Sequence, residues 1–326
     1  MNTEALYRKT AWRLVPFLFL CYIAAFIDRI NVGHAHLQMK ETLGFSDAVY
    51  GLGASIFFVT YVIFEIPSNL LMAKFGIRKT LFRIMLLWGL ASIATALVTS
   101  PWQFYAARLL LGAFEAGFFP AVMLYLSYWF PPARIGRITA LFMTAVMFAG
   151  LIAGPVSGVI LQQMENVAGL QGWQWLFVLE GIPSLLLGCI ALFILSDRPA
   201  SASWLTTSES EYLEAQVGQN SAPSMPRSAM KQTLRDWRIY AWGVSLGLVI
   251  CATYGVTFWL PQMIRAAGNL NYQQTGFFAA IPYVVGLVAM VLTAHHAERH
   301  QEFRRHFAAA AVVGAIGLGG TLLVPE

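Results

Sequence analysis

Two charged residues interrupt the first long apolar segment of the chain. Residues 14–33 read LVPFLFLCYIAAFIDRINVG, and Asp28 and Arg29 lie where the hydrocarbon core of a bilayer would surround a helix. An ionisable side chain at the centre of a membrane helix costs about 2.5–3.5 kcal/mol on insertion scales, and such groups normally face a polar interior. The pair therefore indicates a polar cavity that a charged solute and a proton could use.

A second charged pair, Arg108 and Glu115, lies in the fourth apolar segment. With Gly112 these residues have the spacing i, i+4, i+7, which places all three on one stripe of a helix. At 1.5 Å of rise per residue, the two charges are about 10 Å apart along the axis. Because that is too far for a direct ion pair, each needs a partner from another helix, and Asp28 and Arg29 are the candidates.

These residue types suggest a site that binds a carboxylate substrate and couples its movement to that of a proton. Arginine binds carboxylates through a planar fork of donors, so we assign Arg29 and Arg108 to substrate binding. Tyr22 shares the stripe of Arg29 and joins them. A buried carboxylate can carry a proton, so we assign Asp28 and Glu115 to proton coupling. The alternative is that the charges form interhelical ion pairs that only hold the bundle together.

The composition is that of an integral membrane protein built from helices. Of the 326 residues, 58% are hydrophobic and 11% are charged, whereas soluble domains carry about 25% charged residues. Each predicted span has about 20 residues, enough to cross a hydrocarbon core of about 30 Å. We predict nine spans: 14–33, 51–73, 81–99, 102–125, 138–162, 173–195, 240–260, 275–296 and 306–323.

The distribution of basic residues predicts the orientation. Seventeen of the 21 Lys and Arg residues lie before the first span or in the loops that follow even-numbered spans, and only Lys40 and Arg265 lie in the loops on the opposite side. The positive-inside rule then puts the N-terminus and the loops that follow even-numbered spans in the cytoplasm. This distribution also argues against nucleic acid as the reason for the net charge of +5.

The chain divides into three parts. Residues 1–195 form a predicted six-span bundle, 196–239 a cytoplasmic linker, and 240–326 a bundle of three spans. A capping box of Thr206 and Glu209 predicts a short helix in the linker. The loops MAKFGIRK (72–79) and HAERHQEFRR (296–305) occupy matching places in the two halves. Parallel six-span halves are found in secondary transporters, so the second half is expected to lack three spans, as in a truncated chain.

Other motifs point to packing or exclude alternatives. Gly150, Gly154 and Gly158 form a flat stripe for close helix contact, and Pro155 adds a kink and a hinge. His34 and His36 are expected on a loop, and no set of histidines, cysteines and carboxylates predicts a metal site. The chain lacks a Gly-Lys-Ser/Thr nucleotide loop and a catalytic constellation, so we expect no cofactor and no enzyme.

Several motifs resemble one family in particular. RLLLGAFEAGFFPAVMLYLSYWFPPAR (108–134) closely resembles the anion:cation symporter family of the major facilitator superfamily. So do FIDRINVG, EIPSNLLMAKFG, GWQWLFVLEGIPS, DRPASASWLT and FWLPQMI, and together these motifs cover nearly all of the chain. The resemblance implies the N-terminal six-helix bundle of that superfamily plus three helices of its C-terminal bundle. It also implies proton-coupled uptake of organic anions such as tartrate, sugar acids, hydroxyphenylacetate, phthalate or nicotinate.

The family's substrate-binding arginines and proton-coupling carboxylates fall on Arg29, Arg108, Asp28 and Glu115. The loop signatures depart from the superfamily pattern, because Asn69 replaces a glycine. The further departures are Ala73 for an aspartate, Glu298 for an aspartate and Gln301 for a glycine. The resemblance assigns structural or gating roles to Asn69, Gly76, Arg78, Glu298 and Arg299.

The leading hypothesis is a proton-driven importer of a small organic carboxylate that works in the bilayer without an obligate protein partner. An antiporter or exporter is the alternative within transport, since Gly-Pro motifs also occur in drug antiporters. A non-transporting sensor or a membrane remnant is the alternative outside transport. Because both halves must line the central site, residues 1–326 alone are not expected to transport.

Overall fold

The computed structural model describes residues 2–219, 235–300 and 302–321. In this part of the chain the backbone is helical, and the only β-type pairing is one isolated bridge between Val167 and Leu170. The helices are α1 (Thr3–Thr42), α2 (Asp47–Phe75), α3 (Ile77–Thr95), α4 (Pro101–Glu115), α5 (Phe118–Ser127), α6 (Pro132–Gln163), α7 (Gly172–Ile194), the short 3₁₀ helix η1 (Pro199–Ser201), α8 (Thr207–Gln219), α10 (Trp237–Gly268), α11 (Tyr272–His300) and α12 (Phe303–Thr321).

Seven segments of the described chain are long and apolar enough to cross a membrane. They coincide with seven of the nine predicted spans, with Pro101–Ser127 counted as one segment. The predicted spans 81–99 and 306–323 fall on α3 and α12, which are helical but are not among the seven. The all-helical membrane fold expected from the sequence is thereby confirmed.

Helix α1 is much longer than the predicted span 14–33. The Asn2 side chain caps its start by accepting a hydrogen bond from the Ala5 amide at 3.2 Å, and the helix continues to Thr42. The prediction that His34 and His36 lie on a loop is therefore wrong, and both are buried helix residues. The reason is that the stretch after Gly33 contains no helix breaker until Gly44, whose φ of +67° belongs to the turn after α1.

The predicted fourth span is not one continuous helix. Helix α4 ends at Glu115 and α5 begins at Phe118, because Gly117 adopts a φ of +86°. A Cβ at Gly117 would lie 2.5 Å from the Ser68 Cβ on α2, so the backbone approaches closely here. Glycine fits this position because it tolerates a positive φ and has no side chain to collide.

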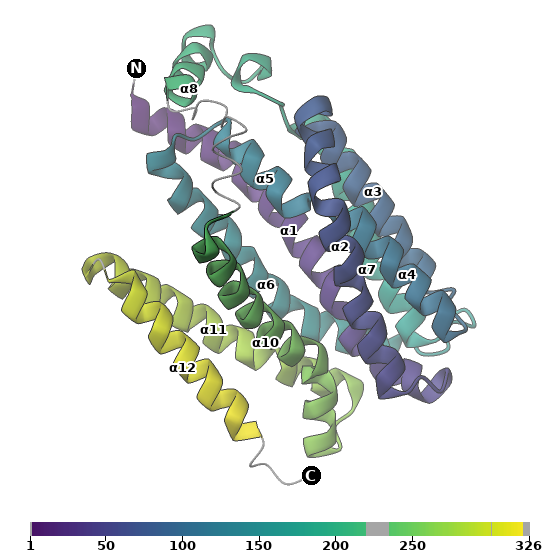
Figure 1. Ribbon diagram of the computed structural model, residues 1–326. Helices are drawn as coiled ribbons and strands as arrows, with labels where there is room; N and C mark the ends of the chain where they lie inside the picture. Colours follow the sequence, from purple (N-terminus) through teal and green to yellow (C-terminus); the bar gives the residue numbers. More distant parts are fainter. Residues whose placement is uncertain (1, 220–234, 301, 322–326) are drawn as a thin grey trace.

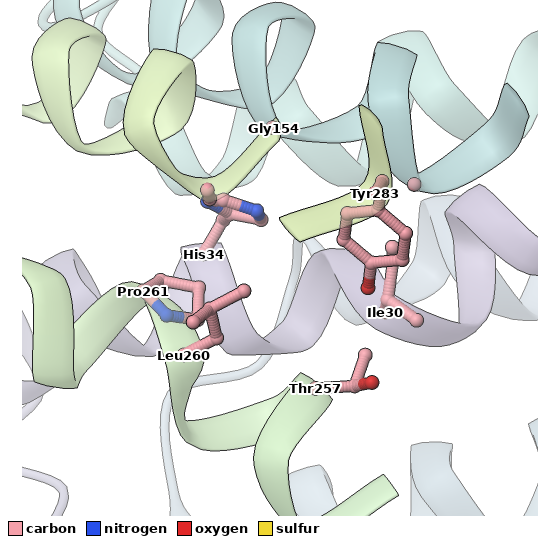
Figure 2. Close-up of a pocket in the computed structure, with 9 residues that line it drawn as sticks. Ile30, His34, Gly154, Thr257, Leu260, Pro261 and Tyr283 are labelled. Carbon is pink, nitrogen blue, oxygen red and sulfur yellow. The ribbon is translucent and has the colours of Figure 1, made fainter. Parts of the chain in front are cut away.

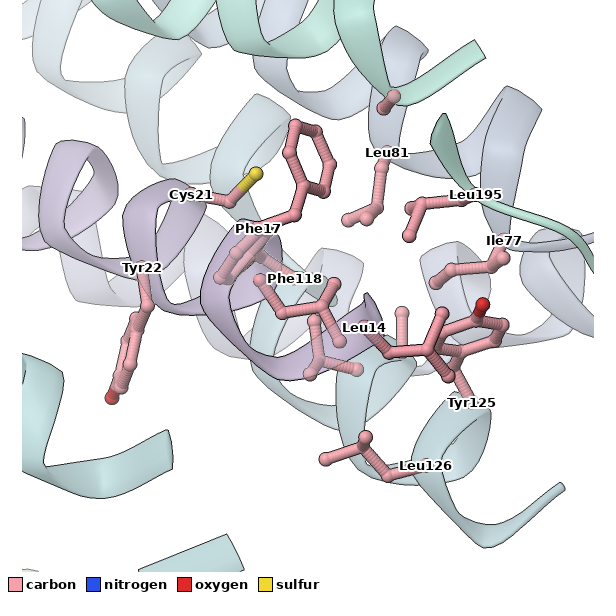
Figure 3. Close-up of a cluster of buried hydrophobic side chains, with 14 of the residues drawn as sticks. Leu14, Phe17, Cys21, Tyr22, Ile77, Leu81, Phe118, Tyr125, Leu126 and Leu195 are labelled. Atoms are coloured by element: carbon pink, nitrogen blue, oxygen red, sulfur yellow. The ribbon is translucent and has the colours of Figure 1, made fainter. Parts of the chain in front are cut away.

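Helices α1 to α7 pack into one bundle, and α10, α11 and α12 lie along one side of it (Figure 1). Figure 3 shows the main apolar cluster of the first bundle, where Phe17 and Cys21 of α1 meet Leu81 of α3 and Leu195 after α7. The two groups of helices meet mainly where α11 packs on α6 and where α10 packs on α1.

The two groups are tied together at the end of the bundle opposite α8. Glu41 of α1 accepts a hydrogen bond from the Tyr272 hydroxyl at 2.7 Å and pairs with Arg265 at 3.1 Å. The Tyr50 hydroxyl donates to the Phe258 carbonyl oxygen at 2.7 Å. These contacts close this end of the molecule in the conformation described.

The linker helix α8 docks on the start of α1. Lys9 pairs with Glu209 at 2.8 Å, and the Trp204 ring stacks on Trp129 with centroids 5.5 Å apart. The hydrogen bond from Lys9 lowers the pKa of Glu209 below its ordinary value. The predicted capping box is present, because the Thr206 amide donates to Glu209 and the Glu209 amide donates to the Thr206 hydroxyl.

The glycine stripe of α6 packs directly on α11. A Cβ at Gly158 would lie 2.7 Å from the Tyr272 carbonyl oxygen, and a Cβ at Gly154 would collide with the Gly276 carbonyl oxygen. A Cβ at Gly150 would collide with the Tyr283 ring. The absence of side chains on this face is what allows the two groups of helices to approach closely.

Replacing Gly158 by valine should destabilise the closed contact between α6 and α11. The added side chain would meet main-chain atoms, which cannot move aside cheaply, and overpacking of this kind costs about 1–3 kcal/mol. We expect a lower melting temperature in detergent. Gly136→Val on the same helix is the matched control, because a Cβ there meets nothing within 4 Å. Equal melting temperatures for the two variants would contradict the close packing.

Candidate functional site

Arg29 is a buried residue of α1 that contacts three other helices. Its Nη2 forms an ion pair with the Glu115 carboxylate of α4, and its Nη1 donates to the Tyr254 hydroxyl of α10 at 2.6 Å. The guanidinium also lies 5.2 Å from the centroid of the Tyr61 ring of α2. One side chain of the first bundle is thus bound both to its own bundle and to the second group of helices.

Arg108 has a buried guanidinium with two free nitrogens. The side chain is 1% exposed, and its Nε donates to the Gly53 carbonyl oxygen at 3.2 Å. Its Nη1 and Nη2 are buried without a hydrogen-bond partner. The guanidinium lies 4.9 Å from the centroid of the Phe57 ring, and the Arg29 guanidinium lies 5.7 Å from the same ring. Both arginines therefore flank one aromatic side chain.

The free nitrogens of Arg108 need an explanation. Leaving a buried donor unpaired costs about 1–3 kcal/mol, and more when the donor is charged, so buried polar groups in proteins almost always have partners. Two adjacent guanidinium N–H groups match the geometry of one carboxylate. The local arrangement is therefore chemically suited to a carboxylate-bearing ligand.

Asp28 faces away from both arginines. Its carboxylate accepts hydrogen bonds from the Trp88 indole at 2.8 Å, the Ser92 hydroxyl at 2.9 Å and the Ser184 hydroxyl at 2.7 Å. These donors belong to α3 and α7. The expectation that Asp28 is a partner for the charges of the fourth span is wrong, because successive residues of a helix point about 100° apart. The partner of Glu115 is Arg29.

Replacing Asp28 by asparagine should destabilise the first bundle. The amide group would turn an N–H₂ toward a cage made of three donors, so at least one donor loses its acceptor. We expect a loss of about 1–3 kcal/mol, the usual cost of a buried unpaired polar group, seen as a lower melting temperature. Asp236→Asn is the control, because that exposed carboxylate caps α10 and asparagine caps equally well. An unchanged melting temperature for Asp28→Asn would show that the cage contributes little.

Tyr22 lies in an aromatic group next to this site. Its ring stacks on Phe142 with centroids 4.7 Å apart and lies 6.0 Å from the Phe118 ring. The described contacts of Tyr22 are therefore aromatic. The sequence reasoning did not assign Phe57, Tyr61 or Tyr254 to the site. No spacing signal could reveal Tyr254, because it meets Arg29 from 225 positions away.

Three of the residues assigned structural or gating roles, Asn69, Gly76 and Arg78, lie where α2 ends and α3 begins. Asn69 donates to the Glu65 carbonyl oxygen at 2.9 Å within α2. Gly76, with a φ of +82°, ends α2 against Asp197, whose carboxylate accepts a hydrogen bond from the Arg78 amide at 3.1 Å. The Arg78 Nε donates to the Leu192 carbonyl oxygen at 3.0 Å. The turn between α2 and α3 is thus tied to the chain that follows α7.

The remaining assigned residues lie on α6 and α11. Pro155 lies inside α6, next to the Gly154 contact with α11. Arg299 is exposed near the end of α11. Glu298 precedes it in the same helix, and its side chain lies outside the described residues, as does Gln301.

Comparisons with known proteins give the family. Residues 18–325 match the Major Facilitator Superfamily. The chain is 44% identical over 330 residues to the putative metabolite transport protein NicT of Pseudomonas putida, covering 100% of this chain and 75% of that protein. It is 43% identical over 317 residues to a putative tartrate transporter of Agrobacterium vitis, covering 95% and 69%. It is 37% identical over 313 residues to a quinolone resistance transporter of Acinetobacter baumannii, covering 95% and 72%.

Solved structures agree on the fold. A bacterial homolog of the human lysosomal transporter Spinster superposes with a TM-score of 0.67 at 18% identity, covering 92% of this chain and 63% of that one. A D-xylose-proton symporter superposes with a TM-score of 0.63 at 16% identity, covering 88% and 69%. The chain therefore spans about two thirds to three quarters of the length of the proteins it matches. On this sequence and structural evidence, the chain belongs to the Major Facilitator Superfamily and is a multi-pass membrane protein of the transporter class rather than an enzyme.

Proposed function

We propose that this chain forms the site of a proton-coupled transporter for a small organic carboxylate. The observation that carries the proposal is the pair of unpartnered, buried guanidinium nitrogens on Arg108. They lie beside an Arg29–Glu115 ion pair that Tyr254 joins to the second group of helices. The names of the relatives, a tartrate transporter among them, support an organic anion as the substrate.

The substrate carboxylate would take the fork of Arg108. Two parallel N–H···O bonds fix the orientation of a carboxylate as well as its charge. The Phe57 ring contacts both guanidinium groups and supplies an apolar wall for the rest of the substrate. Tyr22, whose ring stacks on Phe142 of α6, would contact the substrate from that side.

Arg29 would couple the proton to the substrate by exchanging its anion partner. When Glu115 takes up a proton, an O–H bond forms on the carboxylate and the ion pair with Arg29 breaks. Arg29 can then bind the substrate carboxylate together with Arg108. When the substrate leaves, Glu115 releases its proton and pairs with Arg29 again, so one proton travels with one carboxylate.

Asp28 would be the second proton-coupling carboxyl. It lies next to Arg29 in the chain but contacts α3 and α7 instead of Arg108 or Glu115. A proton on Asp28 would convert one acceptor oxygen into a donor within a cage of three donors. The resulting donor–donor mismatch would shift α1 relative to α3 and α7. Because Arg29 is the next residue of α1, this shift would also move the Arg29 side chain.

Transport would follow alternating access between two parallel halves. We propose residues 1–195 as the first half, 196–239 as the linker and 240–326 as part of the second half. The basic loops make the α8 end cytoplasmic, together with the N-terminus, in a bacterial inner membrane. The contacts of Glu41 and Tyr50 then close the outer end, while the turn held by Gly76, Arg78 and Asp197 belongs to the inner end.

The remaining assigned residues would act in the motion between the halves. The glycine stripe with Pro155 would allow α6 to slide and bend on α11, since the contact is made by main-chain atoms. Asn69, Glu298 and Arg299 would stabilise the inner loops.

An exporter that exchanges a solute for a proton is the second candidate. The similarity to a quinolone resistance transporter favours it. The same Arg29–Glu115 pair could serve either direction, so the direction of flux in an imposed gradient distinguishes the two functions.

The test is proton movement driven by a carboxylate. Because residues 1–326 alone are not expected to transport, they are joined to the three further spans that the parallel-halves plan requires. This twelve-span version is reconstituted in liposomes that contain a pH-sensitive dye, and tartrate or nicotinate is added outside. The proposal expects acidification of the lumen as the anion and proton enter together. Alkalinisation would favour exchange, and no change with either probe, in liposomes that contain folded protein, would contradict the proposal.

A further inference from the structure

A small cavity lies between the two groups of helices and is lined from α1 by Ile30 and His34, which follow Arg29 in the chain (Figure 2). Its volume is about 10 Å³, close to the space needed by one water molecule. His34 of α1 borders it opposite Tyr283 of α11, and Thr257 and Pro261 of α10 complete its polar and apolar sides. The cavity therefore exists only while the outer ends of α1, α6, α10 and α11 are together.

His34 is a polar group that the closed outer end leaves unsatisfied. It is 4% exposed, and its Nδ1 is buried without a hydrogen-bond partner. A neutral imidazole in this position costs one unpaired nitrogen, which a single water in the cavity could relieve. A charged imidazolium would be far more costly there, because a buried charge requires an opposite charge or extensive hydration.

None of the described groups that face His34 across the cavity supplies an opposite charge. From α6 the facing residues are Gly150 and Gly154, and from α10 they are Thr257, Leu260 and Pro261. From α11 they are Ala279 and the titratable but neutral Tyr283.

The nearest charged groups on the surrounding helices do not neutralise a charge on His34. Glu180 of α7 accepts a hydrogen bond from the Ser157 hydroxyl of α6 at 2.8 Å and does not line the cavity. Arg29 lies five residues earlier on α1 and is itself a cation. Arg265 lies four residues beyond Pro261 on α10 and is paired with Glu41. The other histidine of α1, His36, points elsewhere: its ring stacks on Tyr50 and its Nε2 contacts Asp47 at 3.1 Å.

We propose that His34 makes the closure of the outer end depend on pH, because only the uncharged imidazole can be enclosed between the two halves. When the outer ends separate, water reaches the ring, and an ordinary histidine then titrates near pH 6.5. Protonation holds the outer end open, and loss of the proton allows it to close. Acid outside would thus favour the outward-open state. The device goes beyond the proposed function, since it needs neither substrate nor Glu115.

The experiment measures the separation of the outer ends directly. Cys21, Cys189 and Cys251 are replaced by serine, and spin labels are attached at the exposed positions Thr42 and Ala267, at the ends of α1 and α10. Distance distributions between the labels are recorded in lipid at pH 8, 6.5 and 5.5. The variants are His34→Gln, which hydrogen-bonds but carries no charge, and His36→Gln as the matched control on the same helix.

At pH 8 the proposal expects a single distance between the labels. As the pH falls, a growing fraction of molecules should show a second, longer distance. For a single linked proton, the ratio of open to closed molecules rises by at most about tenfold between pH 6.5 and 5.5. His34→Gln should stay closed at all three values, and His36→Gln should respond like the parent. A parent protein that does not respond to pH, or a response that survives in His34→Gln, would overturn the proposal. The distance measurement involves no substrate. A negative result would therefore overturn the role of His34 without bearing on the proposed transport site, which the liposome experiment tests separately.

Discussion

Replacing Arg108 by lysine should weaken the binding of a carboxylate substrate by about 10- to 100-fold. Lysine keeps the charge, but it presents a single ammonium group instead of two parallel N–H donors. Hydrogen bonds to charged groups contribute about 1.5–3 kcal/mol each, and the loss of one of them gives a change of this size. The affinity is measured by titrating tartrate and nicotinate into the purified protein. Arg29→Lys should show a similar loss.

The matched control for these variants is Arg304→Lys, on the exposed side of α12. Its affinity should equal that of the parent protein. If Arg108→Lys and Arg29→Lys also bind both probes with unchanged affinity, the two arginines are structural and the carboxylate site lies elsewhere.

Replacing Glu115 by glutamine should abolish accumulation of the substrate against its gradient. Glutamine is close in shape to the protonated acid, but it cannot exchange a proton, so Arg29 loses its competing anion permanently. Exchange of labelled for unlabelled substrate requires no net proton movement and should continue. Both are measured in liposomes with the twelve-span version of the protein, the first with an imposed pH gradient and the second with excess unlabelled substrate inside.

Glu65→Gln is the control for this prediction, because Glu65 lies partly exposed on α2 and forms none of the described ion pairs. It should retain accumulation. A Glu115→Gln protein that still concentrates the substrate would mean that the proton is carried by another group, Asp28 first among them.

The sequence predicts the helices and the depth of the charged residues well, because both follow from local composition. Asp28, Arg29, Arg108 and Glu115 are all buried in the structure, as their places in apolar segments indicate. The pairing of Arg29 with Glu115 was among the possibilities, since the helix geometry rules out a bond between Arg108 and Glu115. The sequence does not predict which neighbouring side chain each charged residue pairs with.

The rest depends on contacts between distant segments. Tyr254 reaches Arg29 from the second group of helices, and Trp88, Ser92 and Ser184 enclose Asp28 from two others. Such partners follow from how the helices pack, which no single-segment pattern encodes. Two local signals were available but misread.

The first misread signal is the pair Asp28 and Arg29, because adjacent helix residues must face different neighbours. The second is the stretch after residue 33. It contains no breaker until Gly44, so α1 continues and carries His34 into the contact between the halves.

The most direct test of the account is the number of protons taken up when a carboxylate binds. Tartrate or nicotinate is added to the purified protein in a weakly buffered solution, and proton uptake is measured with a pH indicator. If Arg29 leaves Glu115 for the substrate, each bound carboxylate should bring about one proton onto the protein, and Glu115→Gln should take up none. Binding without proton uptake in the parent, or equal uptake in Glu115→Gln, would contradict the exchange of partners at Arg29.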